Sequence, residues 1–171
     1  LLSVTRIEDG GMKIKKQADM LEDLIEEALK HISRKSREFS IRVSMEDEMQ
    51  LVNVDSRLIL QVIINIVDNA VKYTPPGGEI VISTKKEKSF VHVQIADNGK
   101  GIPDEDKPHI FEMFYTANNE ITDSKRSLGL GLALCKSIIN AHGGKIMVYD
   151  NEPKGAVFDF TVPAEEVEIH E

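Results

Sequence analysis

The chain has few of the residues that disulfide-rich or metal-cluster domains depend on. It contains one cysteine, Cys135, and no tryptophan, and aromatic residues make up 5% of its 171 positions. A single cysteine can form neither an intrachain disulfide nor a cysteine-rich metal cluster. Because Cys135 falls in a helical pattern, we expect it to be a small buried hydrophobe. This usage fits a reducing, cytoplasmic compartment.

Long apolar runs and an excess of positive charge are also missing. No run approaches the roughly 18 apolar residues that a membrane-spanning helix needs, and no signal peptide is recognisable. The net charge is −8, and the chain lacks a basic stripe that would offset phosphate repulsion, so nucleic acid is not an expected partner. With 41% hydrophobic and 29% charged residues, the composition is that of an ordinary soluble globular domain.

The chain divides into a stub, one domain and a tail. Residues 1–9 resemble the end of a helix that Gly10 and Gly11 stop. The chain opens without a methionine, so we expect it to be an excised part of a longer protein. The domain spans residues 12–163, and the acidic tail 164–171 is expected to fray.

Hydrophobic periodicity predicts the elements of the domain. We expect strands over 12–17, 40–45, 51–54, 79–84, 90–97, 145–150 and 156–162. We expect helices from Asp19 to about residue 32, over 58–71 with Asp55 or Ser56 as cap, over 106–113, and over 131–142 before Gly143-Gly144. A polar stretch, 116–128, is expected to be a mobile loop. The order predicts a two-layer α/β sandwich, with a mixed sheet of about five strands covered on one face by about three helices.

One polar stripe interrupts the most apolar of these helices. Asn65, Asp68, Asn69 and Lys72 recur at i, i+3, i+4 and i+7, which places them on one helical face. Polar side chains on a buried helix are costly unless something pairs with them. Amide oxygens suit a hard cation and an ammonium suits phosphate, so a nucleotide triphosphate with Mg²⁺ would satisfy the stripe.

Two glycine-containing segments fit the same ligand. Asp97-Asn98-Gly99-Lys100-Gly101-Ile102 follows a strand, where a buried aspartate can accept a hydrogen bond from an exocyclic amine while glycines let the backbone approach a flat base. Ser127–Leu132 carries a GLGL sequence at the expected start of a helix, where glycine N–H groups can bind phosphate. Each alone is weak, since the first is also a common turn and the second a common hinge. No GxxxxGK[ST] sequence is present, so the chain is not a P-loop protein.

Taken together, the motifs resemble the catalytic, ATP-binding domain of sensor histidine kinases. The matching segments are NIVDNAVKYTPPGG, DNGKGIP, IFEMFY, GLGLAL and AHGG...KGAVFDFTVP, and the resemblance covers about residues 12–163. It implies a Bergerat ATP-binding fold. The stub and the adjoining GGMKIKK more weakly resemble osmotic and potassium-sensing kinases.

The resemblance also implies roles for individual residues. Asn69 would ligate Mg²⁺ with help from Asn65, Lys72 would reach a phosphate, and Asp97 would hold the adenine amine. Phe111 and Phe114 would anchor the near end of a lid over the nucleotide. The remaining implied nucleotide-binding residues are Tyr73, Gly99, Gly101, Ile102, Gly129, Leu130, Gly131 and Leu132.

The chain departs from the family pattern at two places near the lid. Thr116 stands where many members have arginine, and Ser127-Leu128 stand where many have Gly-Thr. Lys125 and Arg126 are candidate substitutes for contact with the γ-phosphate, although solvated loop charges are an equally good interpretation.

The resemblance favours phosphotransfer over hydrolysis. ATPase relatives carry a general-base glutamate at the position of Asn65, and an amide cannot take that role. Asp68 is better interpreted as a partner of Asn69 or Lys72. None of the five histidines lies in the pattern of a phosphoacceptor, so the acceptor is expected in an upstream dimerisation domain.

The expected partners and setting follow from the family. They are ATP and ADP, that upstream domain and the receiver domain of a response regulator. The fragment is expected to be a monomeric cytoplasmic piece of a homodimeric parent attached to the inner membrane. Two alternatives stay open: a degenerate nucleotide-binding scaffold, and a Ser/Thr kinase of the same fold.

Overall fold

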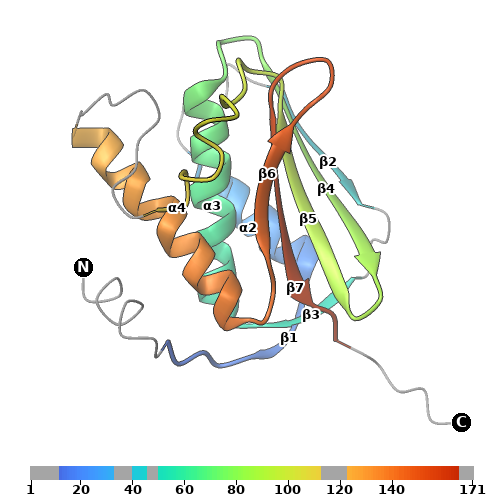
Figure 1. Ribbon diagram of the computed structural model, residues 1–171. Coiled ribbons are helices and arrows are strands. Elements are labelled where there is room, and N and C mark those ends of the chain that lie inside the picture. The colour runs from blue at the N-terminus through green and yellow to red at the C-terminus, as the bar shows by residue number, and fades with distance from the viewer. Residues whose placement is uncertain (1–11, 33–39, 46–49, 113–122, 166–171) are drawn as a thin grey trace, which may run out of the picture.

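The computed structural model describes residues 12–32, 40–45, 50–112 and 123–165, with the backbone alone over 123–130. These residues form two layers, a mixed five-stranded sheet and three helices packed on one of its faces (Figure 1). A two-stranded sheet lies beside the helices at one end of the molecule. The predicted two-layer α/β sandwich is confirmed.

The large sheet places apolar side chains in register on its helix-covered face. Its order is β2 (Ser40–Met45), β4 (Glu79–Glu87), β5 (Phe90–Asp97), β7 (Ala156–Pro163) and β6 (Ile146–Asp150). Strand β2 runs parallel to β4, and the other neighbours are antiparallel. Val93 lies opposite Phe160 and Ile95 opposite Phe158, all buried, because alternate residues of a strand point to one face.

The predicted start of the domain is wrong in detail. The first strand is β1 (Gln17–Met20), not 12–17, and the following helix α2 (Leu21–Lys30) begins two residues later than expected. Strand β1 pairs antiparallel with β3 (Leu51–Val54), so Asp19, the expected helix start, lies in a ladder opposite Val52. That partner is more than 30 residues away, and local periodicity carries no information about it.

Helix α3 (Ser56–Tyr73) carries the polar stripe and also the centre of the core. Ile59, Ile63 and Ile66 are fully buried, as the apolar pattern predicts. Asp55 stands at the N-cap, but its side chain does not cap the helix. Asp55 Oδ2 instead accepts the backbone N–H of Lys15 at 3.1 Å, so the carboxylate holds the segment that enters the domain.

Helix α4 (Asp123–Ala141) is longer than predicted. Residues 123–128, expected in a mobile loop, are helical, and residues 116–122 lie outside the described chain. Adding a residue to an existing helix costs far less than starting one, so a tightly packed helix can extend into a polar sequence. The predicted end is confirmed, because Gly143 and Gly144 donate to the carbonyls of Asn140 and Ile139, both at 3.0 Å.

A short helix expected over 106–113 is wrong. Residues 104–111 form consecutive turns, in which N–H groups bond to carbonyls three residues earlier, as His109 does to Asp106 at 2.9 Å.

At the other end, Ala164 and Glu165 of the predicted frayed tail donate to Ser89 and Leu51. No helix among the described residues has the length and apolarity to cross a membrane.

Candidate functional site

Asn65 of the predicted stripe projects from α3 toward the α4 helix. A Cβ added to Gly131 of α4 would lie 3.7 Å from the Asn65 amide, so Asn65 faces that helix. Gln61 Nε2 donates to Asn65 Oδ1 at 3.0 Å. Burial raises the pKa of the Cys135 thiol to about 12, and a hydrogen bond from Asn65 opposes this shift. Asn69, one turn further on, is 6% exposed. The Asn65 amide is therefore held by neighbouring side chains, and the Asn69 side chain is largely shielded from solvent.

The rest of the stripe, Asp68 and Lys72, lies in the last two turns of α3. Lys72 is exposed there, and Asp68 is half-buried. Burial raises the pKa of the Asp68 carboxyl, as it does for the Tyr73 hydroxyl. Lys100 Nζ lies 6.0 Å from the centre of the Tyr73 ring. This cation lies within the range of a cation–π contact, and it connects α3 to the loop after β5.

Asp97 lies at the end of β5 with its carboxylate turned into the protein. It is 5% exposed, and Oδ1 accepts the N–H of Gly99 at 2.9 Å and of Ala156 at 3.3 Å. Burial raises the pKa of Asp97, and these two hydrogen bonds act against that rise. A carboxylate can accept about four hydrogen bonds. Because both bonds end on Oδ1, Oδ2 can accept one from an exocyclic amine, which the predicted adenine contact requires.

Two glycines allow the loop after β5 to pack against its neighbours. A Cβ on Gly99 would lie 2.7 Å from the carbonyl oxygen of Tyr73, so this residue joins the loop to the end of α3. Gly155 has a φ of +107°, and its Cβ would lie 1.9 Å from the carbonyl oxygen of Asp97. The motif match includes Gly155, but the sequence does not indicate this contact. Gly155 therefore sets the backbone position of Asp97.

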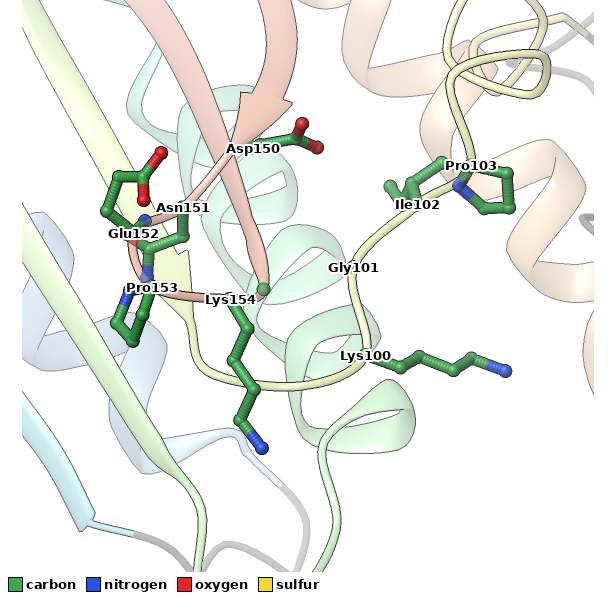
Figure 2. Close-up of a pocket in the computed structure, with 10 residues that line it drawn as sticks. Lys100, Gly101, Ile102, Pro103, Asp150, Asn151, Glu152, Pro153 and Lys154 are labelled. Atoms are coloured by element: carbon green, nitrogen blue, oxygen red, sulfur yellow. The ribbon is translucent and has the colours of Figure 1, made fainter.

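An open cleft of about 410 Å³ lies between this loop and the β6–β7 turn (Figure 2). Gly101 and Ile102 line it together with residues 150–155, whereas Asn65, Asn69 and Lys72 do not. Figure 2 shows the Lys100 side chain directed away from the β6–β7 turn. Of the residues predicted to bind the nucleotide, Gly101 and Ile102 line the cleft and those of the α3 stripe do not.

The segment before the predicted lid is firmly attached. Phe111 packs edge-on against Phe158, with ring centres 6.2 Å apart, and Ile110 is buried. Lys107 forms ion pairs with Asp104 and, at 2.8 Å, with Asp150. Phe111 is therefore packed against β7, and its anchoring of a lid stays a prediction. Phe114 and Thr116 lie outside the described residues.

The structure does not place the GLGL sequence at a helix start. Gly129 and Gly131 lie inside α4, which begins at Asp123, whereas the sequence suggests that the helix begins near them. Leu132 is 9% exposed and belongs to the hydrophobic core. The side chains of Lys125, Arg126 and Leu130 lie outside the described part. Phosphate contacts by this segment thus stay a prediction.

A buried histidine joins the ends of α3 and α4. His142 is 1% exposed, its Nδ1 lies 2.7 Å from the carbonyl oxygen of Ile138, and its Nε2 accepts the backbone N–H of Asp55 at 3.0 Å. These contacts require a neutral ring with the proton on Nδ1. Burial lowers the pKa of His142, and the positive charge of Lys16 acts in the same direction. The bond to Ile138 and the Asp55 charge oppose it.

The lowered pKa of His142 predicts a loss of stability in mild acid. Above pH ~6.5, histidine is neutral in both states. Below pH ~6.5, His142 is protonated in the unfolded chain but still neutral in the folded chain. The free energy of unfolding should therefore fall by up to ~1.4 kcal/mol per pH unit, until the pH reaches the pKa of the folded state. Urea unfolding from about pH 5 to 8 measures this. His142→Gln, whose amide oxygen can accept the Asp55 N–H, should flatten the slope; an unchanged slope would contradict the assignment.

Comparison with known proteins identifies the family. Residues 54–166 match the model of the histidine kinase-, DNA gyrase B- and HSP90-like ATPase family, and this segment contains the α3 stripe, Asp97 and Gly155. The chain belongs to this family. The resemblance to the ATP-binding domain of histidine kinases is thereby confirmed.

Individual members of the family are similar over most of this chain. The sensor protein KdpD of Clostridium acetobutylicum is 42% identical over 96% of the chain, which spans 18% of that relative's length. A catalytic domain of the histidine kinase ThkA has a TM-score of 0.77 at 34% identity, covering 87% of this chain and 95% of that domain. ThkA in complex with the response regulator protein TrrA has a TM-score of 0.77 at 30% identity, covering 96% and 47%.

Proposed function

We propose that this chain binds ATP with Mg²⁺ and that, in a longer protein, it transfers the γ-phosphoryl group to a histidine of an upstream domain. An aspartate of a response regulator would receive the group next, since the similar ThkA is known in complex with a response regulator protein. The observation that carries the proposal is the close contact between Gly99 and the Tyr73 carbonyl. It brings the buried Asp97 carboxylate next to the end of the helix that bears Asn65, Asn69 and Lys72.

The loop after β5 forms the base end of the proposed site. Asp97 accepts the exocyclic amine of adenine, while Gly99 lets the base approach the backbone closely. Tyr73, half-buried at the end of α3, offers an aromatic surface beside the same loop. Because Gly155 holds the backbone of Asp97, the acceptor is positioned before the nucleotide arrives.

The α3 stripe forms the phosphate end. The amide oxygens of Asn65 and Asn69 are suitable ligands for a hard cation, and Lys72 supplies a positive charge for a phosphate. No set of three or more His, Cys, Asp or Glu side chains in the described ranges could hold a metal ion, so the two amides and the phosphates would supply the ligands. Mg²⁺, when bound, neutralises charge on the transferring phosphoryl group.

The side chains at the site favour transfer of the γ-phosphoryl group over hydrolysis of ATP. Asn65 cannot act as a general base on water, because an amide does not bind a proton at neutral pH. His142 uses both ring nitrogens in buried hydrogen bonds, and His92 Nδ1 lies 2.9 Å from Asp159 on the sheet. Neither is available as a phosphoacceptor, and the other two histidines in the described ranges, His31 and His109, lie within hydrogen-bond distance of Glu27 and Glu112. These contacts agree with an acceptor in an upstream domain.

Titration calorimetry with a non-hydrolysable ATP analogue, with and without Mg²⁺, tests the site. We expect Mg²⁺ to strengthen binding of the analogue to the wild type. In Asn69→Ala this increase in affinity should be at least ~10-fold smaller, since the variant loses a metal ligand. Asn140→Ala, which removes an exposed amide on α4, should retain the full gain. An unchanged Mg²⁺ dependence in Asn69→Ala would contradict the metal assignment.

Adding the upstream segment tests the reaction. A chain that includes it should form an acid-labile phosphohistidine from ATP. An acid-stable phosphoserine or phosphothreonine would instead favour the Ser/Thr kinase, and nucleotide binding without any transfer would favour the scaffold. Homodimerisation, membrane attachment of the parent and an osmotic or potassium signal remain predictions of the same proposal.

A further inference from the structure

Thr74, which follows the last residue of α3, is fixed between two glycines. The residue is 4% exposed. A Cβ on Gly78 would lie 2.1 Å from Thr74 Cγ2, and a Cβ on Gly99 would lie 3.2 Å from Thr74 Oγ1. The methyl group is therefore directed toward Gly78 and the hydroxyl group toward Gly99. Adding a side chain at either glycine would disturb this arrangement.

The hydroxyl group of Thr74 is buried and has no hydrogen-bond partner within the described chain. Its polar neighbours are paired: Asn98 Oδ1 accepts the N–H of Glu79 at 2.8 Å, and Asp97 Oδ1 accepts that of Gly99. Burying an unpaired hydroxyl destabilises a protein, and valine would fill nearly the same volume without that cost. Packing therefore explains why a side chain of this shape stands at position 74, but it does not explain why that side chain carries a hydroxyl group.

The place of this oxygen points to a ligand. Asp97 Oδ1 and Thr74 Oγ1 each lie 3.2 Å from the position that a Gly99 Cβ would take, so the two side chains flank one glycine. An ionised carboxylate only accepts hydrogen bonds, whereas a hydroxyl can donate one. Adenine presents the complementary order along one edge, with the exocyclic amine as donor next to ring nitrogen N1 as acceptor. Guanine presents the reverse order.

We propose that Thr74 is a specificity-determining residue of the base pocket, whose hydroxyl donates to the N1 edge of adenine beside Asp97, directly or through one water. This inference rests on the proposed nucleotide site and adds a discriminating group to it. The hydroxyl turns toward the base when the base is bound, and the unpaired oxygen gains its partner then. Asp97 alone would accept an amine from several bases; the pair also requires an acceptor next to that amine, which discriminates against guanine.

Thr74→Val and Thr74→Ser in the full 171-residue chain test the proposal, with calorimetric binding of non-hydrolysable ATP and GTP analogues as readout. Thr74→Val should weaken ATP-analogue binding by about tenfold and leave the weak GTP-analogue binding unchanged, so discrimination shrinks. Thr74→Ser should stay within about threefold of the wild type. Thr84→Val, at a buried threonine of β4, is the matched control and should bind like the wild type.

Melting without nucleotide separates this role from a structural one. Because valine removes an unpaired buried oxygen, the melting temperature of Thr74→Val should equal or exceed that of the wild type while its affinity falls. Wild-type affinity in Thr74→Val, or a joint fall of melting temperature and affinity, would overturn the proposal. A wild type that fails to bind the ATP analogue at all would instead overturn the proposed function itself.

Discussion

Replacing Gly155 with alanine should destabilise the domain by about 3 kcal/mol or more and eliminate nucleotide binding. The residue has a φ of +107°, which L side chains rarely adopt, and its Cβ would lie 1.9 Å from the Asp97 carbonyl oxygen and 2.9 Å from Asn98 Cα. Those atoms belong to backbone that is held on both sides. Asn151 Nδ2 donates to the same carbonyl at 2.8 Å, and Ala156 N–H binds the Asp97 side chain. Relief of the clash must therefore move Asp97 itself.

Gly143→Ala is the matched control for backbone strain. Gly143 has a φ of +76°, but its added Cβ would meet nothing within 4 Å. Strain alone should cost roughly 1 kcal/mol at this position. Urea unfolding of both variants measures the difference, and calorimetry with an ATP analogue measures the effect on the site. If Gly155→Ala proved as stable as Gly143→Ala, the close contact with Asp97 would be wrong.

Asp97→Asn should weaken adenine-nucleotide binding by about 100-fold while leaving stability at neutral pH equal or higher. Burial raises the pKa of Asp97, so the ionised carboxylate is costly in the folded chain, and a neutral amide avoids that cost. The amide oxygen can still accept the N–H groups of Gly99 and Ala156. Its NH₂ group would then face the adenine amine, and two donors cannot pair.

Calorimetric titration with an ATP analogue checks this result, and Asp159→Asn is the matched control. Asp159 is also a buried carboxylate, 4% exposed, but it accepts hydrogen bonds from Tyr149 and Gln94 on the sheet, away from α3. It should bind nucleotide like the wild type. Because the folded pKa of Asp97 is raised, wild-type affinity should also fall as the pH falls toward that pKa, and Asp97→Asn should lack this dependence. Equal affinity of Asp97→Asn and wild type would exclude Asp97 as the base contact.

The fold was predictable wherever a side-chain period repeats over a whole element. Phe158 and Phe160 alternate on a strand, and Ile59, Ile63 and Ile66 recur at helical spacing, so their burial follows from local pattern. The boundaries that failed have non-local causes. Strand β1 forms because β3 pairs with it, and the first turns of α4 extend a helix that is packed elsewhere.

The candidate site shows the same division. Residue type and spacing placed Asn65, Asn69 and Lys72 on one face, and Asp97 at a strand end. The predicted stripe omitted Gln61, the partner of Asn65 Oδ1, and gave no indication of the unpaired hydroxyl of Thr74. Gln61 stands at i−4 from Asn65 and could have been found by extending the stripe one turn. Thr74 carries no such signal.

By itself, the sequence determined the class of fold, the polar face of α3 and the family, because these depend on residue type at short, regular spacing. Only the tertiary structure decided how the pieces meet. Gly155 reaches Asp97 across 58 positions, and His142 reaches Asp55 across 87. Such contacts depend on steric fit and hydrogen-bond geometry between distant segments. A linear pattern contains neither, since both arise only when the chain is folded.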